Sequence, residues 1–194
     1  MRKDVENPCI RICLWELQGV ARGNEDFILA CARDYAAAFA LDESAEALRL
    51  RPTIARSERG KPYFLHVPDL HFSLTHSGLY GACAFCTQGV GLDLQVHSHR
   101  DLMKIARRFF HPQESAYLEN HGFETFFQIW TAKESYMKYT GEGLSMGLNA
   151  FSVVNEDGLL ARMGEVAFRH DAPWAGYSMC LCAREIGHVE ILYI

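Results

Sequence analysis

Long apolar runs are absent from this sequence of 194 residues. The first hydrophobic stretch, residues 10–15, is short and is interrupted by Arg11, so it fits neither a signal-peptide core nor a membrane-spanning helix. The sequence therefore predicts a cytoplasmic protein with no membrane partner.

A surplus of positive charge is also lacking. The 19 Lys and Arg residues are outnumbered by 24 Asp and Glu residues, which gives a net charge of -5. A protein whose whole surface neutralises nucleic-acid phosphates would be basic, so no nucleic-acid partner is expected, although a local basic patch stays open. Hydrophobic residues make up 49% of the chain, enough to bury a core in one domain or in two small domains that pack together.

Cysteine is present in an odd number, seven, and the residues occur in apolar stretches. Such cysteines are expected to be free thiols that behave as small buried hydrophobes. The alternative is a zinc site formed by Cys83, Cys86, His97 and His99. A strand over residues 81–85 would direct Cys83 and Cys86 to opposite faces, which disfavours shared coordination.

Periodicity divides the chain into helical and extended segments. Helices are predicted over residues 25–41 with Asn24 as N-cap, over 102–110, from Pro112 onward, and over 124–139 with a stop at Gly141. Strands are predicted over residues 71–75, 79–85, 89–96, 151–154, 177–183 and 189–194. The fold class is α+β, with two similar halves related by a pseudo-twofold axis, each with helices packed on a small antiparallel sheet.

A carboxylate and an amide lie side by side in the predicted strand 89–96. Period two places Gly91, Asp93 and Gln95 on one face and three aliphatic residues on the other. An ordinary edge strand with a solvated polar face would show the same pattern.

A second charged group lies on the predicted helix 124–139, where Trp130, Glu134 and Lys138 are spaced four apart and share one stripe. One interpretation is a surface ion pair between Glu134 and Lys138 worth about 0.3–0.5 kcal/mol. Phe126 and Phe127 beside this stripe favour the other interpretation, a half-buried wall of a cleft.

Groups that could contact phosphate occur in a third region, although Gly-Lys-Pro by itself is also an ordinary turn pattern. In Arg59-Gly60-Lys61-Pro62, glycine permits close backbone approach and Lys61 supplies a charge. Thr75 and His76, in the segment 71–77, are potential donors to phosphate oxygens.

Together and in this order, these segments resemble the 4′-phosphopantetheinyl transferases of the surfactin-synthetase-activating type. The family pattern is Gly-Lys-Pro, Phe-x-x-Ser-His-Ser, Gly-x-Asp-x-Glu and Trp-x-x-Lys-Glu-x-x-x-Lys, and the resemblance covers residues 59–154. It implies transfer of 4′-phosphopantetheine from coenzyme A to a serine of an acyl, peptidyl or polyketide carrier protein, with Mg²⁺ and with release of 3′,5′-ADP.

The resemblance also implies roles for individual residues. The metal would be held by Asp93, Gln95 and Glu134; catalysis would use Asp93, Glu134 and Lys138; coenzyme A would contact Lys61, Pro62, Thr75 and His76. Residues 1–98 would form a half with the coenzyme A contacts, residues 99–194 a half with the Trp-x-x-Lys-Glu-x-x-x-Lys helix, and the active site would lie between them.

The chain departs from the pattern in three places. Gln95 replaces Glu, Thr75 replaces Ser, and the basic segment before the first long helix is missing or shortened. Because magnesium commonly takes one or two carboxylates and fills its other positions with water and phosphate, Gln95 does not exclude a metal site.

A basic edge is predicted on the helix 102–110. Lys104, Arg107 and Arg108 share one side of it, and Phe109 or Phe110 could add an apolar contact for an acidic carrier protein. A solvated helix face over core phenylalanines explains the same pattern. Two halves in one chain would let a monomer supply both sides of the cleft.

Two other functions stay open. A non-catalytic, coenzyme A-binding paralogue could regulate a carrier protein, although retention of both carboxylates and of Lys138 speaks against it. A magnesium-dependent phosphohydrolase would use the carboxylates but would not explain the Gly-Lys-Pro and Thr-His segments together.

Overall fold

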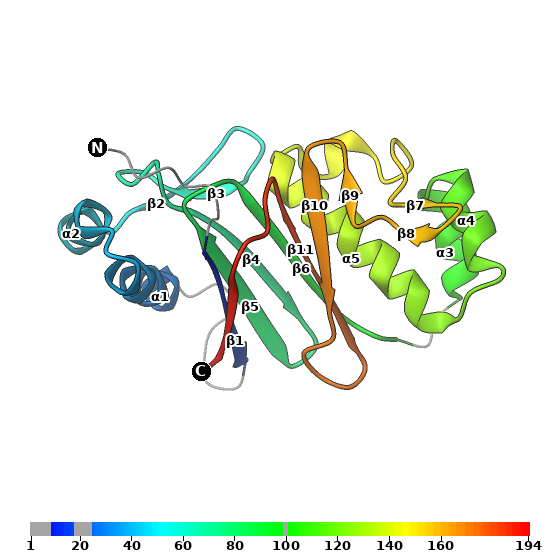
Figure 1. The fold of residues 1–194 in the computed structure, drawn as a ribbon, viewed down its shortest axis with the longest axis horizontal. Helices are drawn as coiled ribbons and strands as arrows, with labels where there is room; N and C mark the ends of the chain where they lie inside the picture. The colour runs from blue at the N-terminus through cyan, green and yellow to red at the C-terminus, as the bar shows by residue number, and fades with distance from the viewer. Residues whose placement is uncertain (1–8, 18–24, 99–100) are drawn as a thin grey trace.

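Two four-stranded sheets organise the part of the chain that this computed structural model describes, residues 9–17, 25–98 and 101–194 (Figure 1). The first sheet has the order β12-β1-β5-β4, with strands β12 (Val189–Tyr193), β1 (Ile10–Glu16), β5 (Tyr80–Cys86) and β4 (His71–Ser77). The second has the order β6-β11-β10-β9, with strands β6 (Val90–Val96), β11 (Tyr177–Ala183), β10 (Val166–Asp171) and β9 (Arg162–Met163). All neighbouring strands are antiparallel except β12 and β1, which are parallel.

The helices cover the outer faces of these sheets (Figure 1). Helices α1 (Glu25–Ala38) and α2 (Asp42–Leu50) lie on the side of the first sheet, and α5 (Phe123–Thr140) packs on β6 and β11 of the second. The remaining elements are α3 (Leu102–Phe109), α4 (Pro112–Leu118), the 3₁₀ turn η1 (Gly143–Met146), and two hairpins, β2 (Ile54–Arg56) with β3 (Pro62–Phe64) and β7 (Val154–Asn155) with β8 (Gly158–Leu159).

Local sequence explains where the C-terminal helices begin and end. The carboxylate of Asp101 accepts the backbone N–H of Lys104 at the start of α3, and Pro112 opens α4. Gly141 ends α5 in the left-handed conformation, with φ of 74°, which glycine adopts without steric cost. The predicted stop at Gly141 and start at Pro112 are confirmed.

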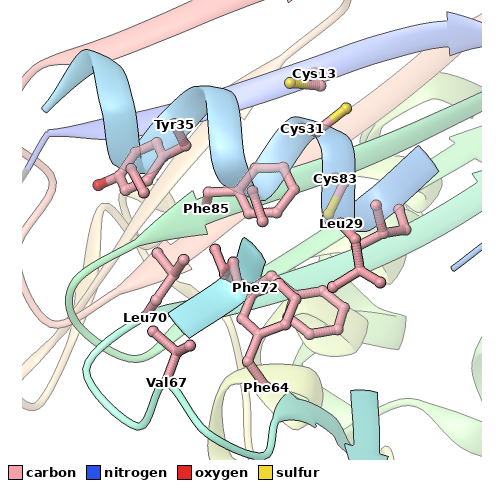
Figure 2. Close-up of a cluster of buried hydrophobic side chains, with 14 of the residues drawn as sticks. Cys13, Leu29, Cys31, Tyr35, Phe64, Val67, Leu70, Phe72, Cys83 and Phe85 are labelled. Atoms are coloured by element: carbon pink, nitrogen blue, oxygen red, sulfur yellow. The ribbon is translucent and has the colours of Figure 1, made fainter. Parts of the chain in front are cut away.

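Three clusters of buried hydrophobic side chains lie between the layers. Figure 2 shows the first, in which Tyr35 of α1 lies with Phe64, Phe72 and Phe85 of the sheet side. The second joins the inner faces of the two sheets, and the third joins α5 to the outer face of the second sheet. The layers therefore follow the order helix, sheet, sheet, helix.

The seven cysteines are free thiols, as the sequence analysis predicted. Cys83 and Cys86 belong to different clusters on opposite faces of β5. His99 lies outside the described residues, and within them no group of three or more His, Cys, Asp or Glu residues could hold a metal ion. The zinc alternative therefore has no support from the described residues.

The sheets are joined at the neighbouring strands β4 and β6 by side chains. The hydroxyl oxygens of Ser73, Thr75 and Ser77 accept the backbone N–H groups of Leu92, Leu94 and Val96 at 2.9, 3.2 and 3.0 Å. We call these three hydroxyl residues of β4 the hydroxyl ladder. Because they share one face of β4 by period two, they satisfy every second N–H group of β6 without a backbone ladder.

Several predicted elements need correction. The helix 25–41 ends at Ala38, and α2, β1 and β10 were missed; Asn24 lies outside the described residues. Of the predicted strand 151–154, only Val154 is extended. The α+β class is confirmed, but the pseudo-twofold relation is not. The sheets also interlock, because β6 joins the second sheet and β12 joins the first. None of the described helices is long and apolar enough to cross a membrane.

Candidate functional site

A cleft of about 270 Å³ lies where the β2–β3 hairpin, strand β4 and the C-terminal half of α5 meet. Its walls bring together three of the sequence motifs, from Arg59 to Pro62, from Phe72 to Leu74, and Glu134 with Lys138. Segments that are far apart in the sequence thus form one concave surface.

Strand β6 supplies the buried carboxylate at this site. Asp93 is only 6% exposed, and Lys138 of α5 donates to its Oδ1 at 2.7 Å and to the carbonyl of Leu92 at 3.1 Å. Gly91 permits this contact, because a Cβ atom there would lie 2.0 Å from the carbonyl oxygen of Ser135. Only glycine lets the α5 backbone lie so close to the strand.

Glu134 faces the same charges. Burial raises its pKa, and the negative charge of Asp93 raises it further, while Lys138 lowers it. Burial also raises the pKa of Asp93 against the opposing effects of Lys138 and Thr75. Of the two interpretations of this stripe, the cleft wall agrees with the structure, because Glu134 and Lys138 both line the cleft and Lys138 pairs with Asp93.

The two neighbouring carboxylates make a ligand set that suits a hard divalent cation, and the ammonium group of Lys138 lies beside one of them. Magnesium prefers carboxylate oxygens and leaves other positions to water or phosphate. Asp93 and Glu134 therefore fit such an ion. The amide of Gln95 donates to the carbonyl of Val96 at 3.2 Å and lines a neighbouring groove beside Phe126 and Trp130.

The residues assigned to coenzyme A divide into two groups. Lys61 and Pro62 line the cleft, and the Lys61 ammonium donates to the carbonyl of Tyr139 at 2.8 Å. Burial lowers the pKa of Lys61. Thr75 and His76 are not part of this lining in the described chain: Thr75 is buried against β6, and His76 is exposed on the opposite side of β4.

Other residues of the cleft were missed. Ser73, Leu74 and Met137 line it, and Arg59 forms an ion pair of 3.7 Å with Glu142, just after α5. Arg59 directly precedes the Gly-Lys-Pro segment, and Glu142 lies between two glycines just after the helix motif. Their closeness to the motifs in the sequence is the feature by which they could have been predicted.

The basic residues of the predicted docking edge are exposed, but one of its two candidate aromatic contacts is buried. Lys104, Arg107 and Arg108 are exposed on α3, and Arg107 forms an ion pair with Glu119. Phe110 as a docking contact is wrong, because it is 4% exposed and stacks on core aromatic rings. Phe109 is 44% exposed, and the Arg108 guanidinium lies over its ring.

Comparison with known proteins finds one family over part of the chain. The profile of the 4′-phosphopantetheinyl transferase superfamily matches residues 89–182, which include β6, α5 and β11 up to Cys182. The chain is 35% identical over 164 residues to "4′-phosphopantetheinyl transferase psf-1" of Bacillus pumilus, covering 75% of this chain and 68% of that protein.

Two relatives from Bacillus subtilis are similar over shorter stretches. "4′-phosphopantetheinyl transferase Sfp" of strain 168 is 35% identical over 138 residues, 65% of this chain and 60% of its own length. A "4′-phosphopantetheinyl transferase" is 38% identical over 106 residues, 52% of this chain and 47% of its own. The chain thus spans about half to two thirds of the length of the relatives that it matches.

Proposed function

The chain belongs to the 4′-phosphopantetheinyl transferase superfamily, and from this premise we propose that it transfers 4′-phosphopantetheine from coenzyme A to a serine of an acyl or peptidyl carrier protein. The observation that carries this proposal is the convergence of Lys61, Glu134 and Lys138 on one cleft, with Asp93 buried beside it. A cleft with ammonium groups and paired carboxylates suits a diphosphate substrate and a divalent cation.

In the proposed reaction, the serine oxygen attacks the phosphorus that bears the pantetheine arm. The bond from this phosphorus to the bridging oxygen breaks, and 3′,5′-ADP leaves. Glu134 takes the serine proton directly or through a water molecule, a role suited to a carboxylate whose pKa burial raises. Mg²⁺ held by Asp93, Glu134 and Gln95 would supply charge neutralisation on the phosphates.

The two lysines have donors to spare for this chemistry. An ammonium group carries three N–H bonds. Lys138 uses two of them, on Asp93 and Leu92, and Lys61 uses one, on Tyr139. The remaining N–H bonds can stabilise negative charge on the phosphates and the leaving group. We keep Pro62 and His76 as proposed contacts of coenzyme A.

The surroundings of the reaction are part of the same proposal. The active site would lie between an N-terminal half, residues 1–98, and a C-terminal half, residues 99–194, of a monomer. The carrier protein would dock on Lys104, Arg107, Arg108 and Phe109, which form a basic surface with one exposed ring. Seven free thiols support a reducing compartment such as the cytoplasm.

Intact-mass spectrometry tests the proposed activity. Several apo carrier proteins are incubated with coenzyme A, Mg²⁺ and this protein, and a gain of roughly one third of a kilodalton is expected because the product is covalent. The Asp93→Asn variant serves as the inactive control. Binding of coenzyme A without any mass gain would instead support the non-catalytic paralogue. Phosphate release from nucleotides without a carrier would support the phosphohydrolase.

A further inference from the structure

We propose that Thr75 is a positioning residue for Asp93, whose carboxylate it holds in the orientation that binds the cation, and that it does not contact coenzyme A. This inference rests on the proposed function, because it assigns Asp93 to a metal site. It changes the role that the family resemblance implied for Thr75.

The hydroxyl proton of Thr75 is used inside the protein. Its Oγ1 accepts the N–H of Leu94 at 3.2 Å and donates to Oδ1 of Asp93 at 3.1 Å. A hydroxyl has one proton to donate. With that proton on Asp93, Thr75 has none for a phosphate oxygen, and its side chain is 5% exposed, behind the lining of the cleft.

The other members of the hydroxyl ladder separate the two roles of Thr75. Ser73 and Ser77 accept backbone N–H groups of β6 just as Thr75 does. Within the described residues, neither serine donates a hydrogen bond to Asp93, whereas Thr75 does. Joining the two sheets is thus common to all three residues, and holding the carboxylate is specific to Thr75.

Two donors from different elements meet on the same oxygen of Asp93. Lys138 reaches Oδ1 from α5, and Thr75 reaches it from β4. Two donors on one carboxylate oxygen restrain the rotation of the group, and in this proposal Oδ2 would be the oxygen left for a cation shared with Glu134. Threonine is stiffer at χ1 than serine, because it is branched at Cβ, and so it holds its hydroxyl in one place.

The test compares Thr75→Val, which keeps the shape and removes the hydroxyl, with Thr75→Ser, which keeps the hydroxyl. Three quantities are measured on the full chain: Mn²⁺ binding by calorimetry, the Mg²⁺ concentration for half-maximal transfer, and coenzyme A binding in EDTA. Partners that orient metal ligands typically change metal affinity by about 10–100-fold. We expect Thr75→Val to weaken Mn²⁺ binding and raise the Mg²⁺ requirement at least about tenfold, with unchanged coenzyme A affinity in EDTA and recovery in Thr75→Ser.

Ser77→Ala is the matched control, because it removes a ladder hydroxyl that accepts the backbone N–H of Val96 and, within the described residues, does not bond to Asp93. It should lower the free energy of unfolding but leave the metal requirement unchanged. The inference is overturned if Thr75→Val behaves like Ser77→Ala, or if it weakens coenzyme A binding in EDTA with a normal metal requirement. If Thr75→Val does not fold, Thr75→Ala takes its place.

The proposed function can fail separately from this inference. A wild-type protein that modifies no carrier would contradict the transferase activity. A loss of Mn²⁺ affinity in Thr75→Val would still support the positioning of Asp93, because that measurement needs no substrate.

Discussion

At the scale of single residues, the central group is Asp93, which is only 6% exposed. Its neighbours determine its pKa and therefore its charge. Burial raises its pKa, whereas the ammonium group of Lys138 and the hydroxyl of Thr75 favour the ionised form. Glu134 stands beside this group with a pKa that burial and Asp93 both raise. Placing a cation between the carboxylates would remove their repulsion, so their charges should matter more for activity than for folding.

Neutralising either carboxylate tests this point. Asp93→Asn and Glu134→Gln keep the shape of each side chain but remove a charge from the proposed metal site. We expect transfer to fall by about two to four orders of magnitude, with a cooperative unfolding transition retained. Glu185→Gln is the control, because Glu185 is exposed and pairs with Arg162 elsewhere. Near-normal transfer in either cleft variant would contradict the metal assignment.

Restoring the family's carboxylate at position 95 should change the Mg²⁺ requirement of transfer in the favourable direction. Gln95 lies on the same strand as Asp93 and two residues along, so both side chains leave the same face. Gln95→Glu should lower the Mg²⁺ concentration needed for half-maximal transfer, because a third negative charge binds the ion more tightly. An unchanged requirement in a folded variant would place Gln95 outside the metal shell.

At the scale of elements, a second ion pair holds helix α5 in place. Lys133 of α5 and Glu114 of α4 are both fully buried and 2.7 Å apart. Lys133 also donates to the carbonyl of Phe151, and Glu114 accepts the N–H groups of Val153 and His111. Two helices and the segment after η1 are thus bound to one buried pair.

Removing one partner of this pair should destabilise the fold. Lys133→Met leaves the Glu114 carboxylate buried and unpaired, which typically costs about 3–5 kcal/mol. Urea denaturation measures this loss. Arg162→Met, which breaks an exposed pair with Glu185, should cost at most about 1 kcal/mol. Equal losses in the two variants would show that the buried pair has no special role.

The same pair explains a strand that sequence reasoning placed wrongly. Residues 151–154 alternate like a strand, but the carbonyl of Phe151 and the N–H of Val153 bond to the side chains of Lys133 and Glu114 instead of a partner strand. Strand β11, by contrast, was predicted at its observed bounds, because it is apolar except for Ser178 and is buried on both faces. A local pattern cannot reveal that distant charges will take over backbone hydrogen bonds.

The site shows the same division. Period two placed Asp93 and Gln95 on one face of β6, and period 3.6 placed Glu134 and Lys138 on one face of α5, whereas their roles came from the family resemblance. The pairing of Asp93 with Lys138 and with Thr75 joins three elements that are separated along the chain. Strand β1 was missed in the same way, because it is buried by pairing with β5 on one edge and with β12 on the other. These contacts depend on the tertiary fold, which no single segment specifies.

At the scale of the whole molecule, buried imidazoles make stability depend on pH. Burial lowers the pKa of His71, His97 and His170, and the ring nitrogens of His170 have no hydrogen-bond partner in the described chain. The unfolded chain therefore takes up protons first as the pH falls. The contribution of these groups to stability is fully present above about pH 6.5 and is lost as the pH falls toward their folded pKa values.

Unfolding measurements at pH 7.5 and 5.5 test this dependence. The wild type should have a lower urea midpoint at pH 5.5, and the decrease should be smaller in His170→Leu, which has no imidazole to protonate. The raised pKa values of Asp93 and Glu134 act in the opposite sense, so the comparison of the two proteins isolates the histidine. An identical decrease in both proteins would contradict a role for His170.

The parallel pairing of β1 with β12 has a consequence for biosynthesis. Strand β1 is translated long before β12. One of its edges pairs with β5, but the other edge has to wait for residues 189–193. At about 5–20 residues per second, ribosomes need roughly 10–40 s to reach that point. During this time the nascent chain presents an apolar strand with an open edge, which is the kind of surface that chaperones recognise. Completion of the first sheet therefore waits until β12 has been translated, and a chain interrupted before residue 189 keeps an unpaired edge on β1.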